Sequence, residues 1–201
     1  LDQEFARWDC AQHPFFRQLD ATGGRDRFND YVSQFAHLAQ ARADCITGAS
    51  RRSDQHGSPL ARLAVTEHDR AQRWVEEAAS LTGTAVAARH DTELCTSAWS
   101  GQAALEAFSG TWKQLLVTSY VTAAISTSAA RELARHLPMA ADLLARCHEP
   151  PHTQELKQLV AAIIDPYEPI NLGVAVIALR GFWVMLTDCA GRNPADPLEA
   201  T

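Results

Sequence analysis

The feature of this sequence that most constrains its fold is a long helical periodicity between residues 25 and 46. Apolar side chains recur there mostly at spacings of three and four, at Phe28, Tyr31, Val32, Phe35, Leu38, Ala39, Ala43 and Ile46. Because an α-helix completes a turn in about 3.6 residues, this spacing gathers them on one face. The β-branched alternation that is typical of strands is nearly absent from the chain. These patterns predict an all-α protein.

Prolines and glycines divide the rest of the chain into further predicted helices. We expect helices over about residues 1–8, 14–22, 25–46, 59–81, 100–124, 130–147, 153–164 and 169–189, with breaks at 48–58, 84–97 and 148–152. About seven helices with short connections indicate one compact bundle over residues 1–192, followed by a flexible tail over residues 193–201. The last helix is apolar almost all the way round, so we expect it at the centre of the bundle.

Composition and charge argue against several classes of partner. The 201-residue chain carries a net charge of −6, whereas a phosphate-binding face usually leaves a basic excess. Its five cysteines form no CxxC pair, which indicates reduced thiols. No signal peptide is recognisable, and the apolar run from Leu172 to Leu186 contains Arg180 and is too short to cross a bilayer. We therefore expect a cytoplasmic protein without a nucleic-acid or membrane partner.

Glu67 is the most informative single residue. It falls in the middle of the apolar face of the helix predicted over residues 59–81, while His68 and Arg70 fall at the two edges of that face and Asp69 points away. A carboxylate that faces a core is costly unless it is paired, protonated or bound to a metal ion. Two interpretations stay open: a buried ion pair or hydrogen bond between helices, or a functional group in a pocket.

Arg180 is the second anomaly, because nearly every other side chain in its helix is apolar. A guanidinium in a central helix needs an anionic partner. Either Glu67 supplies that partner when the pocket is empty, or the carboxylate of a ligand does. We expect Arg180→Leu to cost several kcal/mol in the first case and to abolish ligand binding in the second.

Three histidines carry weaker predictions. His148 and His152 have the i, i+4 spacing of a metal pair, but Pro150 and Pro151 prevent the helix that would aim them together. His13 is expected to cap or pack a helix rather than to bind a ligand.

Hydroxyl and aromatic side chains supply further candidates. Tyr120 shares its predicted helix with small hydroxyl residues at 118, 119 and 122, which either line a polar cavity or bond their own i−4 carbonyls. Trp74, Trp112 and Trp183 are expected in the core, although aromatic rings around a buried charge also suit a small planar ligand.

Three segments resemble the TenA and PqqC superfamily, whose shared architecture is the haem oxygenase-like helical bundle. Residues 13–38 are similar to a family pattern that begins with an HPF motif and continues with a glycine and an aromatic-rich helix. This helix contains a Tyr and a Gln, which are Tyr31 and Gln34 here. Residues 178–190, ALRGFWVMLTDCA, are similar to its closing helix. Residues 66–69, TEHD, resemble the acid-His-Asp segment of PqqC-type synthases. The resemblance implies a haem oxygenase-like fold.

The sequence departs from the functional residues of two groups in this superfamily. Phe35 stands where TenA-type thiaminases have an Asp, Thr118 or Ser119 falls near the place of their nucleophilic Cys, and Leu179 falls near the place of their Glu. Thiamine-pyrimidine hydrolysis is therefore not expected. Of the ligands of the related di-iron oxidases, only Glu67 has a counterpart here.

The resemblance to PqqC-type enzymes leads to the main functional hypothesis, an oxidase that acts on an anionic metabolite in cofactor or specialised metabolism. Glu67 or His68 would accept a proton, Tyr120 would donate a hydrogen bond, and Arg180 would hold the anionic group. The substrate would also contact the aromatic side chains Tyr31, Phe35, Trp74 and Trp183.

Two other hypotheses stay open beside the oxidase. One is a non-catalytic relative that binds a small molecule or a partner protein. The other is an iron oxygenase with an unusual ligand set that includes Glu67 and His68. The cofactor is accordingly none or iron, and by analogy with the group we expect a homodimer.

Overall fold

The computed structural model describes residues 2–20, 24–52, 59–82, 112–137, 141–142, 144, 150–165 and 169–191. These residues are almost entirely helical, and no strand occurs among them. The prediction of an all-α protein is therefore confirmed. The predicted loop over residues 84–97 and the predicted tail over residues 193–201 lie outside the described residues.

The helices follow one another as a short N-terminal series and then as long rods. The first series is α1 (Asp2–Arg7), a 3₁₀ turn (Cys10–Gln12) and α2 (Pro14–Gln18). The long helices are α3 (Gly24–Arg52), α4 (Pro59–Thr82), α6 (Trp112–His136), α8 (Pro150–Ile163) and α9 (Pro169–Ala190).

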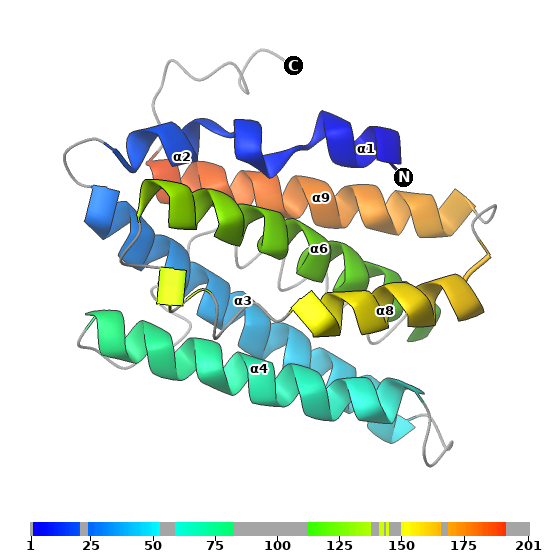
Figure 1. Ribbon diagram of the computed structural model, residues 1–201. Coiled ribbons are helices and arrows are strands. Elements are labelled where there is room, and N and C mark those ends of the chain that lie inside the picture. The colour runs from blue at the N-terminus through cyan, green and yellow to red at the C-terminus, as the bar shows by residue number, and fades with distance from the viewer. Residues whose placement is uncertain are drawn as a thin grey trace.

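Figure 1 shows how these helices are arranged in space. Helices α1 and α2 lie along α9 at one side of the molecule, and α4 lies at the opposite side. Between them run α6 and α3, and α8 lies beside α6. Helices α3 and α4 form the most extensive contact, and α6 contacts α2, α8, α9 and the 3₁₀ turn. Helix α3, which contacts both α4 and α9, therefore joins the two sides of the bundle.

Local sequence signals explain where several helices begin and end. Prolines open α2, α4, α8 and α9, where the missing N–H would have no partner within the helix. Gly24 opens α3 directly beside Leu19, and a Cβ at this position would lie 1.9 Å from the carbonyl oxygen of Leu19. Gly191 follows the last residue of α9 with φ of 73°, a left-handed conformation that favours glycine after a helix.

The buried apolar side chains form two clusters. The larger, which we call the aromatic cluster, contains the buried rings Phe15, Phe16, Phe28, Tyr31, Phe35, Trp74 and Phe182 together with aliphatic residues of α3, α6 and α9. The smaller, which we call the aliphatic cluster, consists of Ile46, Ala49, Leu60, Leu63, Ala64, Leu115, Leu116, Ala123 and Leu156. Both clusters draw residues from α3, α4 and α6, so these helices run from one cluster to the other.

Two helix boundaries differ from the predictions. Helix α3 continues to Arg52, so residues 48–52 are helical rather than part of a loop. Helix α6 continues from Trp112 to His136 without the break predicted between residues 124 and 130. The Ser and Thr side chains there bond carbonyls of the preceding turn, for example Thr127 to Ala123 at 2.7 Å, and the helix continues around them.

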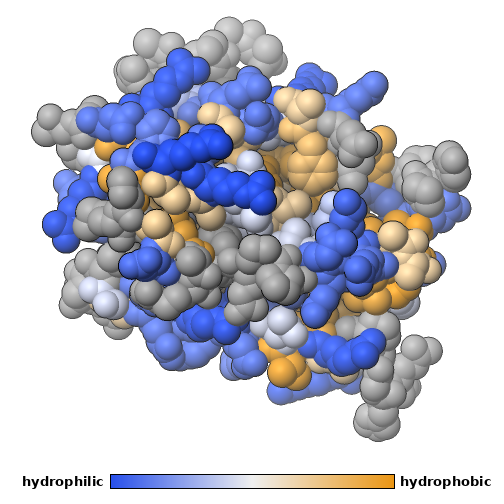
Figure 2. All heavy atoms as spheres, in the orientation of Figure 1, coloured by the Kyte–Doolittle hydropathy of each residue, from blue (hydrophilic) through white to orange (hydrophobic). Residues whose placement is uncertain are grey.

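Helix α9 is not the most enclosed helix, contrary to the prediction. Leu172, Ile177 and Val184 on it are 46%, 44% and 36% exposed. The apolar stretch Asn171–Ala190 is also longer than the run from Leu172 to Leu186 that was considered in the sequence. By length and composition alone, it is long enough to cross a membrane. The opposite face of α9 packs on α2, α3 and α6. In Figure 2 hydrophobic side chains gather in patches among hydrophilic ones on the face shown.

Candidate functional site

A layer of buried polar side chains separates the two apolar clusters. It contains Arg42 of α3, Glu67 and Arg70 of α4, Thr118, Ser119, Thr122 and Ser126 of α6, and His152 of α8, all of them buried. Along α3, the layer falls between Leu38 of the aromatic cluster and Ile46 of the aliphatic cluster. We call this group the polar layer.

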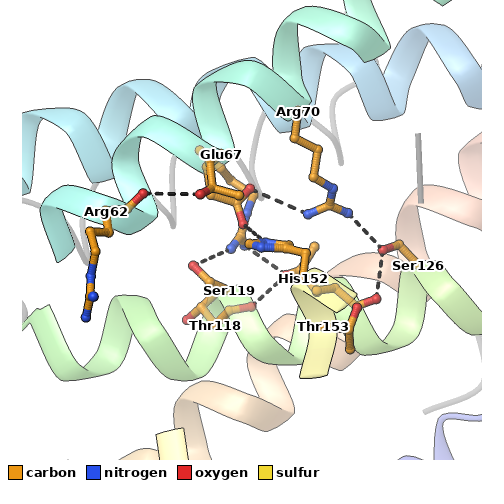
Figure 3. A network of polar contacts seen from close by, with 12 residues as sticks. Arg62, Glu67, Arg70, Thr118, Ser119, Ser126, His152 and Thr153 are labelled. Atoms are coloured by element: carbon orange, nitrogen blue, oxygen red, sulfur yellow. Dashed lines mark hydrogen bonds and ion pairs between the residues drawn. The ribbon is translucent and has the colours of Figure 1, made fainter. Parts of the chain in front are cut away.

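Glu67 lies at the centre of the polar layer, and its two carboxylate oxygens have different partners (Figure 3). The Oε1 atom lies 2.8 Å from Nε2 of His152, and the Oε2 atom lies 3.5 Å from Nη1 of Arg70. Glu67 is 3% exposed, which confirms the prediction that its side chain enters the core. The first of the two interpretations, a pairing between helices, is realised through α8 rather than α9.

The surroundings of Glu67 keep its carboxyl group ionised. Burial by itself would raise the pKa, but the charge of Arg70, the hydrogen bond from His152 and the charge of Arg42 outweigh it and lower the pKa from 4.5 to about 2. An ionised carboxylate can only accept hydrogen bonds. The Nε2 atom of His152 must therefore carry the proton and donate it to Glu67.

The hydroxyl groups of α6 hold the two buried guanidinium groups. Arg42 donates from Nη1 to Oγ1 of Thr122 at 2.8 Å and from Nη2 to Oγ of Ser119 at 3.0 Å. Arg70 donates from Nη2 to Oγ of Ser126 at 3.4 Å. The Thr122 hydroxyl donates to the carbonyl of Thr118 at 2.8 Å, so its lone pairs stay available to Arg42. The predicted bonding of Thr118 and Thr122 to carbonyls of their own helix is therefore confirmed, whereas the α6 hydroxyls contact buried guanidinium groups and do not line the cleft.

His152 reaches Glu67 because α8 begins at Pro150. The predicted break over residues 148–152 is wrong for residues 150–152, which belong to α8. A helix tolerates prolines in its first turn, where the N–H groups have no intrahelical partners. His152 is 5% exposed, and its position in the first turn aims the ring at α4 (Figure 3). His148, its predicted metal-binding companion, lies outside the described residues.

A cleft of about 580 Å³ opens between α4 and α8, and His152 forms part of its wall. Its polar lining consists of Arg62, Thr66, His152, Glu155 and Gln158, and its apolar lining of Leu63, Leu156, Leu159 and Ala162. This volume falls in the usual range of sites for small molecules. Because Glu67 engages Nε2 of His152, the other ring nitrogen, Nδ1, is the one that remains for a molecule in the cleft.

Arg180 does not meet Glu67, contrary to the prediction. Its side chain is exposed, and its guanidinium carbon lies 5.2 Å from the centre of the Trp8 ring. Because Arg180 shares the exposed side of α9 with Ile177 and Val184, the charge stays in water while the helix buries its other face. The predicted pocket between Glu67 and Arg180 is therefore not formed.

The other predicted catalytic residues lie apart from the cleft. His68 is exposed on α4, whereas the neighbouring Glu67 is buried, so these two side chains do not converge on one proton or one metal ion. Tyr120 is half-buried on α6 and packs against both apolar clusters. Neither residue lines the cleft.

The predicted aromatic contacts also gather elsewhere. Phe35 lies 5.8 Å from Tyr31 and 4.6 Å from Trp74 between ring centres, and all three rings are buried in the aromatic cluster. Trp183 is half-buried, and its ring lies 4.6 Å from that of His13. The structure therefore brings three of the four predicted aromatic residues together, but as packing rather than as lining of the cleft.

His13 has the capping role that the sequence predicts. The N–H of Phe15 donates to its Nδ1 atom at 3.1 Å at the start of α2, and its Nε2 atom lies 3.1 Å from Oγ1 of Thr187. Burial lowers the pKa of His13 to about 4, against a weaker opposite effect of a backbone hydrogen bond with Trp183. His13 is therefore neutral near pH 7.

Metal ligands and reactive thiols are the remaining groups that could carry chemistry. In the part of the chain that the structure describes, no three His, Cys, Asp or Glu side chains are grouped so that they would hold a metal ion. Cys10, Cys45 and Cys189 carry thiols rather than disulfides, as predicted, and Cys95 and Cys147 lie outside the described residues. Burial raises the pKa of Cys10 to about 12, so this thiol stays protonated and unreactive.

Arg42 is a member of the site that was not predicted from the sequence. It follows Leu38 by four residues and precedes Ile46 by four, so it occupies the apolar face of α3. This is the same signal that identified Glu67.

Comparison with known proteins adds no family to these observations. No protein-family model matches the chain, and neither does any curated protein or any solved structure. The resemblance to the TenA and PqqC superfamily therefore stays a prediction, and the argument for function depends on the polar layer and the cleft beside it.

Proposed function

We propose that this chain is a small-molecule enzyme in which His152 exchanges a proton with a substrate bound in the cleft between α4 and α8. The observation that carries this proposal is the buried 2.8 Å contact between Nε2 of His152 and Oε1 of Glu67, at the wall of a cleft of about 580 Å³. A histidine fixed by a carboxylate on one nitrogen presents the other nitrogen as a general base or acid.

Each member of this pair has a distinct role. Glu67 fixes the tautomer of His152 by accepting from Nε2, which leaves a lone pair on Nδ1 to take a proton from the substrate. When Nδ1 becomes protonated, the adjacent carboxylate stabilises the imidazolium ion. Arg70 and Arg42 keep Glu67 ionised throughout this cycle, because their charges lower its pKa. Glu67 is thus a positioning residue, and His152 is the proposed catalytic residue.

The proposal keeps the oxidase of an anionic metabolite as its specific form, together with a haem oxygenase-like bundle, a cytoplasmic location and a homodimer. The segments that resemble PqqC-type proteins are what supports this form. In such an oxidase, His152 would remove one proton from the substrate, and dioxygen would take up the two electrons and two protons that the substrate loses, including the one held by His152, and leave as hydrogen peroxide. In this assignment, His152 takes the catalytic roles that the sequence suggested for His68 and Tyr120. The polar lining of the cleft takes the role in binding the anionic group that it suggested for Arg180.

Iron does not fit the described residues of this site. The oxygens of Glu67 are engaged by His152 and Arg70, and Arg42 contributes a second positive charge nearby. A metal cation placed between these groups would be repelled by both guanidinium ions. We therefore assign no step to a metal ion.

The test is turnover by site variants on a panel of small anionic and zwitterionic metabolites. Dioxygen uptake is followed with an electrode, and products are followed by mass spectrometry. We expect His152→Asn to lower kcat about 10²-fold to 10⁴-fold, the usual contribution of a general base, and Glu67→Gln to lower it less. Wild-type rates in His152→Asn would overturn the proposal.

His136 provides a matched control for His152. It also pairs with a carboxylate, since its Nδ1 atom lies 2.9 Å from Oδ2 of Asp20, but this pair is at the surface and away from the cleft. We expect His136→Asn to turn over substrate at the wild-type rate. An equal loss in both histidine variants would indicate that the loss reports folding rather than chemistry.

A second candidate is a binding protein without catalysis. The observation that favours it is the engagement of both Glu67 oxygens by protein groups, which is also expected of a purely structural ion pair. Ligand binding to the cleft without turnover of any compound would support this candidate over the enzyme.

A further inference from the structure

The cleft between α4 and α8 carries two opposite charges that do not pair with each other. Arg62 lines it from α4 and Glu155 lines it from α8, and both side chains are exposed. Within the residues that the structure describes, neither side chain forms an ion pair, and only the backbone carbonyl of Arg62 is engaged, by the Thr66 hydroxyl at 3.3 Å. Both charges are thus available to a bound molecule.

An apolar surface completes the lining of the same cleft. It is formed by Leu63 on α4 and by Leu156, Leu159 and Ala162 on α8. On α8, these residues follow His152 and Glu155 at spacings of three and four, so one face of the helix presents a histidine, an acid and an apolar stripe together. A ligand that matches this face has charged groups joined by an apolar body.

We infer that the cleft binds a small zwitterion whose anionic group pairs with Arg62 and whose cationic group pairs with Glu155. The apolar body of this molecule lies over the leucines, and its reacting atom faces Nδ1 of His152. The position of the reacting atom rests on the proposed function, whereas the two ion pairs do not. A simple anion fits less well, because the carboxylate of Glu155 would repel it within the same cleft.

The test uses three probes of equal chain length: 6-aminohexanoate, hexanoate and hexylamine. Their dissociation constants are measured at low ionic strength from the shifts of backbone amide signals of α4 and α8 in nuclear magnetic resonance spectra. We expect the zwitterion to bind about fivefold more tightly than either singly charged probe, which is the gain from one additional ion pair in a wet cleft. Equal affinities for the three probes would overturn the inference.

Two variants separate the proposed ion pairs. Arg62→Gln should weaken 6-aminohexanoate and hexanoate about fivefold without weakening hexylamine, and Glu155→Gln should weaken 6-aminohexanoate and hexylamine about fivefold without weakening hexanoate, whose repulsion by Glu155 it removes. Asp69→Asn and Arg131→Gln are the matched controls, because both residues are exposed and neither lines the cleft. Uniform effects on all probes, or equal effects in the controls, would contradict the inference.

The His152→Asn variant makes failure of this inference distinguishable from failure of the proposed function. It should bind 6-aminohexanoate with the wild-type affinity while its turnover is lost. If His152→Asn loses turnover but the protein does not prefer the zwitterion, the proposed function stands and the proposed ligand class is rejected. A preference for the zwitterion with wild-type turnover in this variant would reject the catalytic role of His152 and retain the ligand class.

Discussion

The aromatic cluster and the polar layer are equally dry, yet they are built on different principles. Phe35 and Trp74 in the cluster are 2% and 0% exposed, and Glu67 in the polar layer is 3% exposed. The cluster is stabilised by burial of ring surface, which depends on shape and area. The polar layer is stabilised only while each charge keeps its partner, and apolar side chains of similar volume would often serve stability as well. Exclusion of water therefore does not identify the candidate site, whereas the retention of paired charges does.

The largest effect is expected from removing a ring of the aromatic cluster. Trp74→Ala should lower the free energy of unfolding by about 3–5 kcal/mol, because it removes buried surface and leaves a cavity beside Phe35. Urea-induced unfolding measures this loss. Val65→Ala on the same helix, where Val65 is 63% exposed, is the control and should change stability by less than about 0.5 kcal/mol. A loss below about 1 kcal/mol for Trp74→Ala would show that this cluster is not tightly packed.

A smaller loss is expected when the polar layer loses its negative charge. Glu67→Gln keeps the shape and part of the hydrogen bonding but leaves Arg70 and Arg42 without their carboxylate, which should cost about 2–3 kcal/mol. The exposed Glu76, replaced by Gln, provides the control. If both substitutions have the same small effect in urea unfolding, Glu67 is not held in a dry ion pair.

Acidification should affect the start of α2, at His13, and the polar layer in separate pH ranges. The pKa of His13 is lower in the folded state, about 4, than its ordinary value of 6.5, so the unfolded chain binds more protons between these values and stability falls as pH decreases through this window. For Glu67 the corresponding window lies lower, from 4.5 to about 2. At about pH 5 the chain should be about 2 kcal/mol less stable than at about pH 8, chiefly because of His13.

His13→Gln tests this assignment, because it removes the titrating group at the start of α2. The variant should lose most of the dependence of stability on pH between 6.5 and 4, the window set by the His13 pKa. Stability is measured by urea unfolding at several pH values in both proteins. An unchanged pH profile in His13→Gln would assign the acid sensitivity of this range to other groups.

The smallest effect is expected at Arg180, which belongs to neither region. Its contact with the Trp8 ring is exposed, so Arg180→Gln should cost only about 0.5–1 kcal/mol. Thermal unfolding of the variant measures this loss. A cost of several kcal/mol would instead support a buried anionic partner, as the sequence alone suggested, and would contradict the separation between α9 and the polar layer.

The pattern of apolar residues predicted the helices well but predicted their surroundings less well. The spacing that starts at Phe28 identified α3, and the same reasoning placed Glu67 in the core. The same reasoning wrongly predicted that Arg180 is buried, because hydropathy does not show which side of an apolar helix its neighbours leave uncovered. The partner of Glu67 proved to be His152, which lies 85 positions away in the sequence, and no local pattern indicates a contact across that separation.

Prolines and small hydroxyl residues caused the other errors. Two prolines ahead of His152 were interpreted as a break, but the same residues are compatible with the first turn of a helix. Similarly, the Ser and Thr residues of α6 resemble a break in the hydrophobic pattern, yet they are buried and hydrogen-bonded to their own helix. In both cases the deciding factor is whether a backbone group has a partner, which the residue type alone does not reveal.

The protonation state of the His152 ring tests the central claim most directly. Nitrogen-15 spectra of the histidine side chains at mildly alkaline pH distinguish a ring with the proton on Nε2 from one with the proton on Nδ1. Because the ionised Glu67 accepts from Nε2, we expect His152 to carry its proton there and to exchange it slowly with water, with both properties lost in Glu67→Ala, which removes the acceptor. A ring that is protonated on Nδ1, or that exchanges as fast as the exposed His68, would contradict the account.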